Sequence, residues 1–515
     1  MGYVQQLLSQ RANEDANRIA FVHGHLGTVL TWGDVAFHAA EWLEHMDTAS
    51  EPRTRLVGLA LSAPTSFCSS YLAALGSGIP IAPLDPRATA DELGERASVL
   101  ALTDVIGDRL DAAQTRALTD VGARVWIKGA RGMQLIVNSA GRRNSISETI
   151  APSVVLATSG STGSPKLVPL SERQLLYVAG QVVTHHRLGR DDRGYSPLPL
   201  FHINAQVVGV LATLISGGSL VVEERFGKES FWDTARELGA TWLNLVPAIL
   251  AVLGAMRGPA CSEAGAIRFA RSASSPLSDA VRERFESSSG IGVLETYGMT
   301  EAASQITANP LRPENRRSGS VGVPVGVDLR VVDDNGNSMR SGETGTVQLR
   351  GPGVVNRYLA PGRMHANPAR EANGWFTTGD LGHQDTDGFV FLVGRVDDVI
   401  NRGGEKVYPR EIEEVLLRDQ RVSDAAATGR PHPTLGTQPV AFVTTSLPAD
   451  ARARLSTELA QSCAAALSRY KRPVEIFVTD ALPVGATGKI ARHRLAQFSE
   501  LALGGETISA PSTAS

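Results

Sequence analysis

Residues 158–166, TSGSTGSPK, combine the glycines and side chains that bind the phosphates of a nucleotide. Gly160 and Gly163 allow the backbone to turn its N–H groups toward an anion, and Lys166 adds a positive charge. Hydroxyl donors are supplied by Thr158, Ser159, Ser161 and Thr162. The segment is not a Walker A loop, because neither Ser nor Thr follows Lys166. A Ser/Gly linker has a similar composition, but the apolar run at 154–156 favours a strand that ends in a phosphate-binding loop.

A second segment, YGMTE at 297–301, follows an apolar strand-like run. Tyr297 offers an aromatic face that can stack on a purine, and Glu301 offers a carboxylate for Mg²⁺. Thr300 adds a hydroxyl that can bind a phosphate. Taken alone, the segment is also compatible with an ordinary turn from a strand to a helix.

Two further segments carry single charged residues beside glycines. Asp380, in WFTTGDLG at 375–382, suits a carboxylate that accepts both hydroxyl groups of a ribose. Lys489, in PVGATGKIARHRL at 483–495, lies in a glycine-flanked loop from which a flexible cation can reach a neighbouring cleft. A turn aspartate and a surface lysine are the plainer interpretations of these two residues.

The elements that must position these segments change character along the chain. Apolar runs predict strands at 20–22, 55–61, 79–83, 105–106, 125–128, 220–223, 242–246, 267–272 and 292–295. Helix-like segments separate them, which indicates largely parallel sheets covered on both faces. After about residue 318, alternating Gly-rich segments predict an antiparallel, β-rich subdomain. A compact α+β unit with helices at 409–417 and 451–468 is expected beyond residues 394–398.

Composition sets the limits on size and partners. With 515 residues, of which 42% are hydrophobic, the chain is expected to form two or more domains. A net charge of −3 without a basic block argues against nucleic acid or an anionic membrane as the main partner. The longest apolar stretch, 203–216, is too short to span a bilayer. Three widely spaced cysteines fit structural thiols in the cytoplasm.

The order of the segments resembles that of the adenylate-forming superfamily, which comprises acyl-CoA synthetases, adenylation domains and luciferases. The matching series extends over about 330 residues and consists of 158–166, 297–301, 376–382, 394–413 and 483–490. The resemblance implies an α/β fold: a large N-terminal domain of mixed sheets layered with helices, a β-rich subdomain and a small mobile α+β lid domain. The implied boundaries are 1–394 for the adenylation domain, 395–398 for a hinge, 399–502 for the lid and 503–515 for a disordered tail.

The resemblance also implies a reaction in two halves. A carboxylate attacks the α-phosphate of ATP to give acyl-AMP and pyrophosphate, and the thiol of coenzyme A then displaces AMP. Because two anions must meet, cations and N–H donors have to offset the charge on the reacting phosphorus. The implied cofactors are Mg²⁺, ATP and coenzyme A.

Residue roles follow from the resemblance position by position. In it, Lys489 bridges the attacking carboxylate and the α-phosphate, Tyr297 stacks on adenine, Glu301 holds Mg²⁺, and Asp380 with Arg395 binds the ribose. The catalytic set is Lys489, His202, Thr300 and Glu301. The nucleotide-binding set is Thr158, Ser159, Gly160, Ser161, Thr162, Gly163, Lys166, Ser274, Glu295, Thr296, Tyr297, Gly298, Asp380 and Arg395.

Asp397 matches the hinge position, where rotation of the backbone would swing the lid between the two half-reactions. After that swing, Gly403 and Gly404 are expected to line the tunnel for the thiol arm. A plain turn is the alternative for these two glycines.

The acid is harder to infer. Amino-acid adenylation domains carry an aspartate just after the phenylalanine of a PLPLFHIN-type segment, whereas this chain has His202, which favours a free carboxylic acid. His202 is either a gate to the thiol tunnel or a buried structural histidine. Segments 268–278, 296–311 and 319–326 resemble the oxalyl-CoA synthetase branch. The expected acid pocket consists of His202, Asn204, Ala205, Gly209, Ala273, Gly298, Ala303 and Ser304.

Asn204 and Ser304 stand where the oxalyl-CoA synthetase branch usually has histidines. Losing two potential cations favours a bulky, largely apolar acid over a diacid. The alternatives are an oxalate–CoA ligase, an enzyme that loads a carrier protein, and a non-catalytic nucleotide-binding homologue; luciferase-type oxidation is remote. A cytoplasmic monomer or homodimer is expected.

The hinge interpretation predicts opposite effects for two substitutions. Lys489→Ala should abolish acyl-AMP formation yet spare thioester formation from supplied acyl-AMP, whereas Asp397→Pro should do the reverse by freezing the hinge. Pyrophosphate release and thioester formation, measured separately, test this. Equal losses of both half-reactions in both variants would contradict the two-conformation account.

Overall fold

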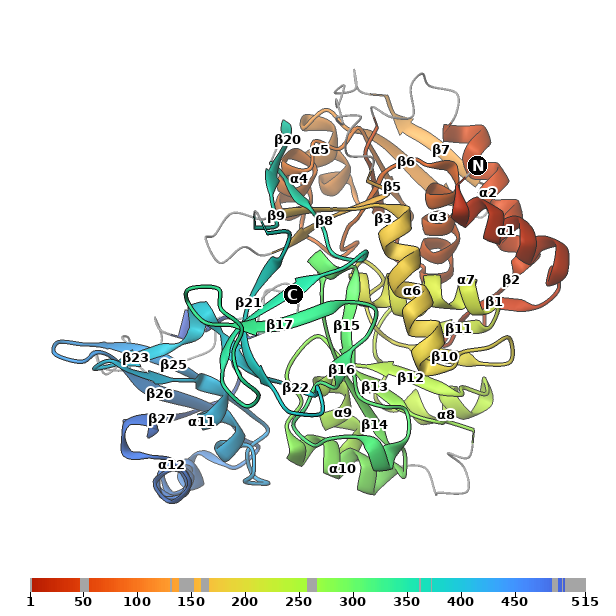
Figure 1. Ribbon diagram of the computed structural model, residues 1–515. Coiled ribbons are helices and arrows are strands. Elements are labelled where there is room, and N and C mark those ends of the chain that lie inside the picture. The colour runs from red at the N-terminus through yellow and green to blue at the C-terminus, as the bar shows by residue number, and fades with distance from the viewer. Residues whose placement is uncertain are drawn as a thin grey trace. The chain divides into compact units, whose positions relative to one another are not determined.

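The computed structural model describes residues 2–46, 55–129, 132–138, 152–158, 166–256, 266–360, 363–371, 373–483, 490–492 and 494–495. The described chain has the predicted mixed α/β fold and divides into two compact units (Figure 1). The first unit contains Met1–Leu277, Val281–Leu329 and Leu349–Phe376, and the second contains Ser278–Ala280, Arg330–Gln348 and the chain from Thr377 onward. The boundaries inferred from the sequence, at 394 and 399, stay a prediction, as does the disordered tail.

The first sheet of the first unit contains nine described strands, and its centre is parallel. The strand order is β16 (Val323–Pro324), β15 (Ser304–Ala308), β14 (Val293–Met299), β13 (Ala270–Ser272), β12 (Trp242–Leu245), β10 (Arg193–Ser196), β11 (Ser219–Val222), β1 (Ile19–His23) and β2 (Val29–Thr31). Only the outer strands β2, β15 and β16 pair antiparallel. The strands predicted near 20, 220, 242, 270 and 293 are therefore confirmed.

The second sheet also contains nine described strands. Their order is β20 (Arg363–Pro368), β19 (Arg357–Ala360), β9 (Lys166–Leu170), β8 (Val154–Thr158), β4 (Ile81–Pro83), β3 (Val57–Ala60), β5 (Asp104–Gly107), β6 (Arg124–Gly129) and β7 (Gly132–Val137). Strands β3 and β5 are buried along their whole length, as expected for parallel strands with both faces covered.

Helices cover these sheets, and several begin at caps that are visible in the sequence. They are α1 (Tyr3–Glu14), α2 (Trp32–Met46), α3 (Pro64–Ser77), α4 (Ala90–Val99), α5 (Ala112–Asp120), α6 (Glu172–His186), the π-helix η2 (Ala205–Leu211), α7 (Ala212–Ser216), α8 (Phe231–Glu237), α9 (Pro247–Gly254), α10 (Asp279–Ser289), and the short 3₁₀ turns η3 (Thr300–Ala302) and η4 (Pro313–Asn315). Helices α1, α2 and α3 pack side by side (Figure 1). Capping boxes start α4, α5 and α6, the last at Ser171 and Gln174.

The later chain forms two smaller sheets, as the change in sequence texture predicts. The first has the order β17 (Asp328–Val332), β18 (Gly345–Arg350), β21 (Phe376–Gln384) and β22 (Val390–Arg395). The second contains β24 (Glu405–Val407), β23 (Ile400–Arg402), β26 (Gly436–Thr444), β25 (Asp424–His432) and β27 (Ile476–Thr479). Helices α11 (Pro409–Leu416) and α12 (Ala449–Ala466) share a core with it, and η5 (Val396–Asp398) and η6 (Arg469–Lys471) are 3₁₀ turns.

No described helix combines the length and the apolar character that crossing a membrane requires.

A buried charge cluster fixes the second sheet of the first unit. The Asp104 carboxylate is fully buried and lies 3.1 Å from Arg55, 2.9 Å from Arg124 and 2.9 Å from the indole nitrogen of Trp126. Burial alone would raise the pKa of Asp104, but Arg55, Trp126 and Arg124 outweigh it, so the pKa lies below its ordinary value.

Asp104→Asn should therefore lower the free energy of unfolding by about 3–5 kcal/mol, because it leaves two arginines without their buried counter-charge. The control is Asp328→Asn, since Asp328 is 64% exposed where it pairs with Arg350 at 3.2 Å, and it should change the value by about 1 kcal/mol or less. Urea unfolding at several pH values measures both.

The pKa of Asp104 is lower in the folded protein than in the unfolded chain, where it is about 3.9. The stability that Asp104 provides is therefore fully present above the unfolded pKa and is lost as the pH falls through the folded pKa. The stability gap between wild type and Asp104→Asn should close in that acidic range. A gap that persists there, or equal losses in the two variants at neutral pH, would contradict the assignment.

Candidate active site

Predicted residues on and just after β13 and β14 lie where three parallel strands end. The pairing register of β12, β13 and β14 places Leu245, Ser272 and Glu295 in line. Beyond them, β13 runs into Ala273 and Ser274. At the end of β14, Gly298 lies where a β-carbon would collide with the carbonyl oxygen of Ser304, so the close approach of these strands requires glycine. The end of a strand in a parallel sheet is a frequent place for a ligand site.

The backbone at this edge is strained. Ser274, Ala303 and Ser304 have φ angles of 77°, 52° and 101°, in a region that residues other than glycine rarely adopt. Each such conformation costs on the order of 1–3 kcal/mol and clusters at functional sites. All three residues belong to the predicted nucleotide or acid sites.

Glu301 is connected to the phosphate-loop region through Tyr358. The Tyr358 hydroxyl donates to Glu301 Oε1 at 3.2 Å, and Lys166 Nζ lies 5.3 Å from the centre of the Tyr358 ring. Strand β19, which carries Tyr358, pairs with β9, which begins at Lys166. Tyr358 is a residue that the sequence argument missed, because a single tyrosine in strand β19 carries no motif.

The surroundings of Glu301 fit its predicted role as a magnesium ligand. The residue is 8% exposed, and its carboxylate accepts a hydrogen bond from the neutral Tyr358 hydroxyl. Mg²⁺ is usually held by one or two carboxylates together with substrate phosphates, so one available carboxylate suffices. The described chain contains no group of three or more potential metal-binding side chains.

The phosphate loop is described only at its two ends. Thr158 ends β8, pairs with Lys166 at the start of β9 and donates from Oγ1 to the Lys166 carbonyl oxygen at 3.3 Å. The loop thus joins two antiparallel strands, and β9 was not predicted. Ser159, Gly160, Ser161, Thr162 and Gly163 lie outside the described residues, as does Lys489.

The ribose and hinge candidates lie in the second unit. Asp380 and Arg395 are register partners in β21 and β22, and their side chains approach to 3.3 Å. Asp397 belongs to the 3₁₀ turn η5 directly after β22. Gly403 and Gly404 form the turn between β23 and β24 with φ angles of 61° and 93°, so the turn conformation itself calls for glycine.

Two of the acid-pocket candidates, Ala205 and Gly209, belong to an unexpected π-helix, η2. The centres of the Phe201 and His202 rings lie 4.4 Å apart, and Asn204 directly precedes η2. Ala205, Gly209, Ala273 and Ala303 are all buried. A π-helix is rare and is frequently found at functional sites. That these small residues line the pocket for the acid stays a prediction.

A second residue that the sequence argument missed is Arg271, in the middle of β13. Its side chain is 1% exposed, and its Nη1 donates to Asn204 Oδ1 at 2.9 Å and to Asn244 Oδ1 at 3.1 Å. Desolvation lowers the pKa of the guanidinium to about 9. The signal available in the sequence was an arginine inside the segment predicted as a strand, 267–272.

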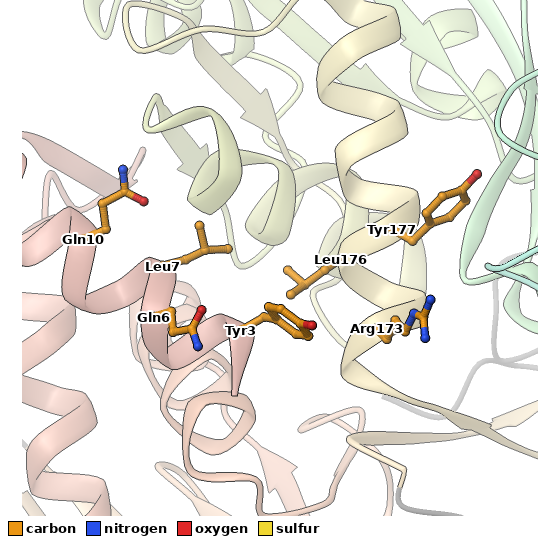
Figure 2. Close-up of a pocket in the computed structure, with 7 residues that line it drawn as sticks. All are labelled: Tyr3, Gln6, Leu7, Gln10, Arg173, Leu176 and Tyr177. Atoms are coloured by element: carbon orange, nitrogen blue, oxygen red, sulfur yellow. The ribbon is translucent and has the colours of Figure 1, made fainter. Parts of the chain in front are cut away.

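A surface groove of about 580 Å³ lies elsewhere in the first unit, between α1 and α6 (Figure 2). Its walls are Tyr3, Gln6, Leu7, Gln10, Arg173, Leu176 and Tyr177. None of the predicted site residues lines it, so this groove is distinct from the predicted reactive centre.

Comparison with protein families gives two matches. The model for AMP-binding enzymes matches residues 8–359, and the model for the AMP-binding enzyme C-terminal domain matches residues 411–489.

Two of the named relatives are CoA ligases. The sulfoacetate–CoA ligase of Cupriavidus necator is 41% identical over 349 residues, which cover 67% of this chain and 67% of the relative. The oxalate–CoA ligase of Arabidopsis thaliana is 33% identical over 86% of this chain and 88% of the relative.

Solved structures of the Bacillus subtilis o-succinylbenzoate CoA synthetase have the same fold. The complex with its acyl-adenylate intermediate has a TM-score of 0.80 at 25% identity and covers 95% of this chain and 97% of that chain. The complex with ATP and a magnesium ion also has a TM-score of 0.80 at 25% identity, with coverages of 95% and 98%.

The contact between Tyr358 and Glu301 predicts a selective effect on magnesium. Tyr358→Phe removes the hydroxyl that orients the carboxylate and should raise the Mg²⁺ concentration for half-maximal pyrophosphate release about 10-fold. Tyr177→Phe is the control, because its hydroxyl donates to the Gly326 carbonyl oxygen at 3.0 Å. Equal magnesium dependence in the two variants would refute a positioning role for Tyr358.

Proposed function

This chain belongs to the AMP-binding enzyme family, and we propose that it joins a free carboxylic acid that lacks an α-amino group to coenzyme A. It is an AMP-forming acid–thiol ligase, which uses ATP and Mg²⁺ and passes through an acyl-adenylate. The observation that carries the proposal is the arrangement of Glu301, Tyr358 and Lys166, because it offers a carboxylate and a cation within one connected set of contacts.

The residues have distinct tasks in this proposal. Lys166 and the loop before it hold the β- and γ-phosphates, and Tyr297 stacks on adenine. Asp380 with Arg395 holds the ribose. When bound, Mg²⁺ would be held by Glu301 and would offset phosphate charge.

The first half-reaction needs a cation between two anions. Lys489 fills this role by bridging the acid's carboxylate and the α-phosphate as the new C–O–P linkage forms and pyrophosphate leaves. For the second half-reaction, rotation at Asp397 brings Gly403 and Gly404 to the thiol arm. Loss of one such charge-stabilising contact typically costs on the order of 10²- to 10³-fold in rate.

Two kinds of acid are candidates: a bulky, largely apolar acid and oxalate. His202, where an amino-acid-activating domain has an aspartate, supports an acid without an ammonium group. By their names, two relatives act on sulfoacetate and oxalate, which are small acids with a second anionic group.

A carrier protein as the thiol donor and a non-catalytic role remain alternatives. The sequence favours catalysis over nucleotide binding alone, because it contains Glu301, Lys166, Asp380, Arg395 and Lys489, and a protein that only binds has no need of the last. The cytoplasmic location and the choice between monomer and homodimer stay predictions.

Pyrophosphate release across a panel of acids tests the function. The panel contains oxalate, sulfoacetate, short and long fatty acids, benzoates, cinnamates and polycyclic acids. We expect ATP- and Mg²⁺-dependent release with at least one acid, and conversion of the acyl-AMP to a thioester by coenzyme A faster than by a pantetheinylated carrier protein. Release with no acid would support the non-catalytic alternative, and a faster reaction with the carrier would reassign the acceptor.

A further inference from the structure

Arg271 holds a positive charge where the fold supplies no negative one. Its guanidinium contacts only neutral side-chain amides: Asn204 at 2.9 Å, Asn244 at 3.1 Å and Gln305 at 3.5 Å. Across the described chain, no carboxylate forms an ion pair with it. Buried arginines are normally paired, because removing an unpaired charge from water is costly.

A buried histidine close to Arg271 carries no charge of its own. His186 is fully buried nearby, and its pKa lies well below the ordinary value because of burial and because of the positive charges of Arg271, His185 and Arg268. The histidine is therefore neutral and does not act as a second cation. Arg271 is thus the charged group of this cluster.

The cluster also contains more hydrogen-bond donors than acceptors. The Nε atom of Arg271 and the Nε2 atom of Gln305 are both buried, and both lack a hydrogen-bond partner. Each is a donor, since arginine cannot accept and an amide nitrogen cannot accept. Unsatisfied buried donors around a cation are complementary to an anion.

The cluster lies beside the predicted acid pocket. Asn204, which binds Arg271, also approaches Ser274 Oγ at 3.4 Å, at the end of β13. Gln305 is the register partner of Gly298 in the pairing of β14 with β15. Asn204 and Gly298 both belong to the acid pocket expected from the sequence. The donors of Arg271 and Gln305 therefore lie next to the residues that are expected to bind the acid.

We propose that Arg271, with Gln305 and Asn204, binds a second anionic group on the acid, either a carboxylate or a sulfonate, while the first carboxylate reacts with ATP. This inference rests on the proposed function and narrows its substrate to a short dianionic acid. Asn204 and Ser304, which stand in place of two histidines, led to the expectation of a bulky apolar acid. The inference departs from that expectation, because Arg271 on β13 supplies the positive charge that those histidines would have supplied.

Matched pairs of acids test the second charge without changing the size of the acid. In each pair a methyl group replaces one anionic oxygen: oxalate against pyruvate, malonate against acetoacetate, and sulfoacetate against methylsulfonylacetate. The readout is the ratio of kcat/KM for pyrophosphate release within each pair. The pair with the largest ratio distinguishes a carboxylate from a sulfonate.

Three variants separate recognition from folding. Arg271→Met removes the charge. Asn204→Asp places a carboxylate against Arg271, which supplies the counter-charge from inside the protein. Arg316→Met is the control, because Arg316 is also held by neutral oxygens, the carbonyls of Pro310, Leu311 and Val293.

Wild type should prefer the dianion by roughly 10²-fold or more, because its absence leaves buried donors unpaired. Arg271→Met and Asn204→Asp should each reduce that ratio toward one, whereas Arg316→Met should leave it unchanged. If Arg271→Met does not fold, as judged by thermal unfolding, Asn204→Asp still decides.

A ratio near one in the wild type, or an unchanged ratio in a folded Arg271→Met or Asn204→Asp variant, would overturn the inference. If a monoanionic acid then reacts well, the proposed ligase function stands without it. Absence of pyrophosphate release with every acid would instead count against the proposed function itself.

Discussion

The pairing register of β12, β13 and β14 is the constraint on which the site depends. It aligns Asn244 with Arg271, and Leu245 with Ser272 and Glu295, so that the three strands end side by side at one edge of the sheet. The short turn η3 can then carry Glu301, and β15 returns close enough for Gln305 to reach Arg271. A slip of one residue would turn every one of these side chains to the other face of the sheet.

The same register creates an electrostatic imbalance. Asp104 and Arg271 show the two ways in which this fold treats a buried charge: Asp104 is surrounded by Arg55 and Arg124, whereas Arg271 meets only amide oxygens. The first arrangement stabilises a sheet. The second leaves a charge that is satisfied only when a partner of opposite sign arrives, which is how a binding site gains selectivity rather than stability.

Much of this architecture could be predicted from the sequence. The alternation of apolar runs predicted the parallel strands, and the series that begins with TSGSTGSPK predicted the family. Tyr358 and Arg271 were missed because their importance comes from partners far away in the chain, Glu301 in one case and Asn204 with Gln305 in the other. The π-helix at Ala205–Leu211 could not be predicted either, since its residues have no distinctive pattern and tertiary packing decides its hydrogen bonding.

The most direct test of the account is a crystal structure with a non-hydrolysable ATP analogue and a short dianionic acid, oxalate or sulfoacetate. The account predicts that the second anionic group lies within about 2.7–3.2 Å of the Arg271 guanidinium and the Gln305 amide nitrogen. If that group instead lies away from β13 while Asn204 and Asn244 still hold Arg271 alone, the buried arginine is a structural element and the substrate assignment is wrong.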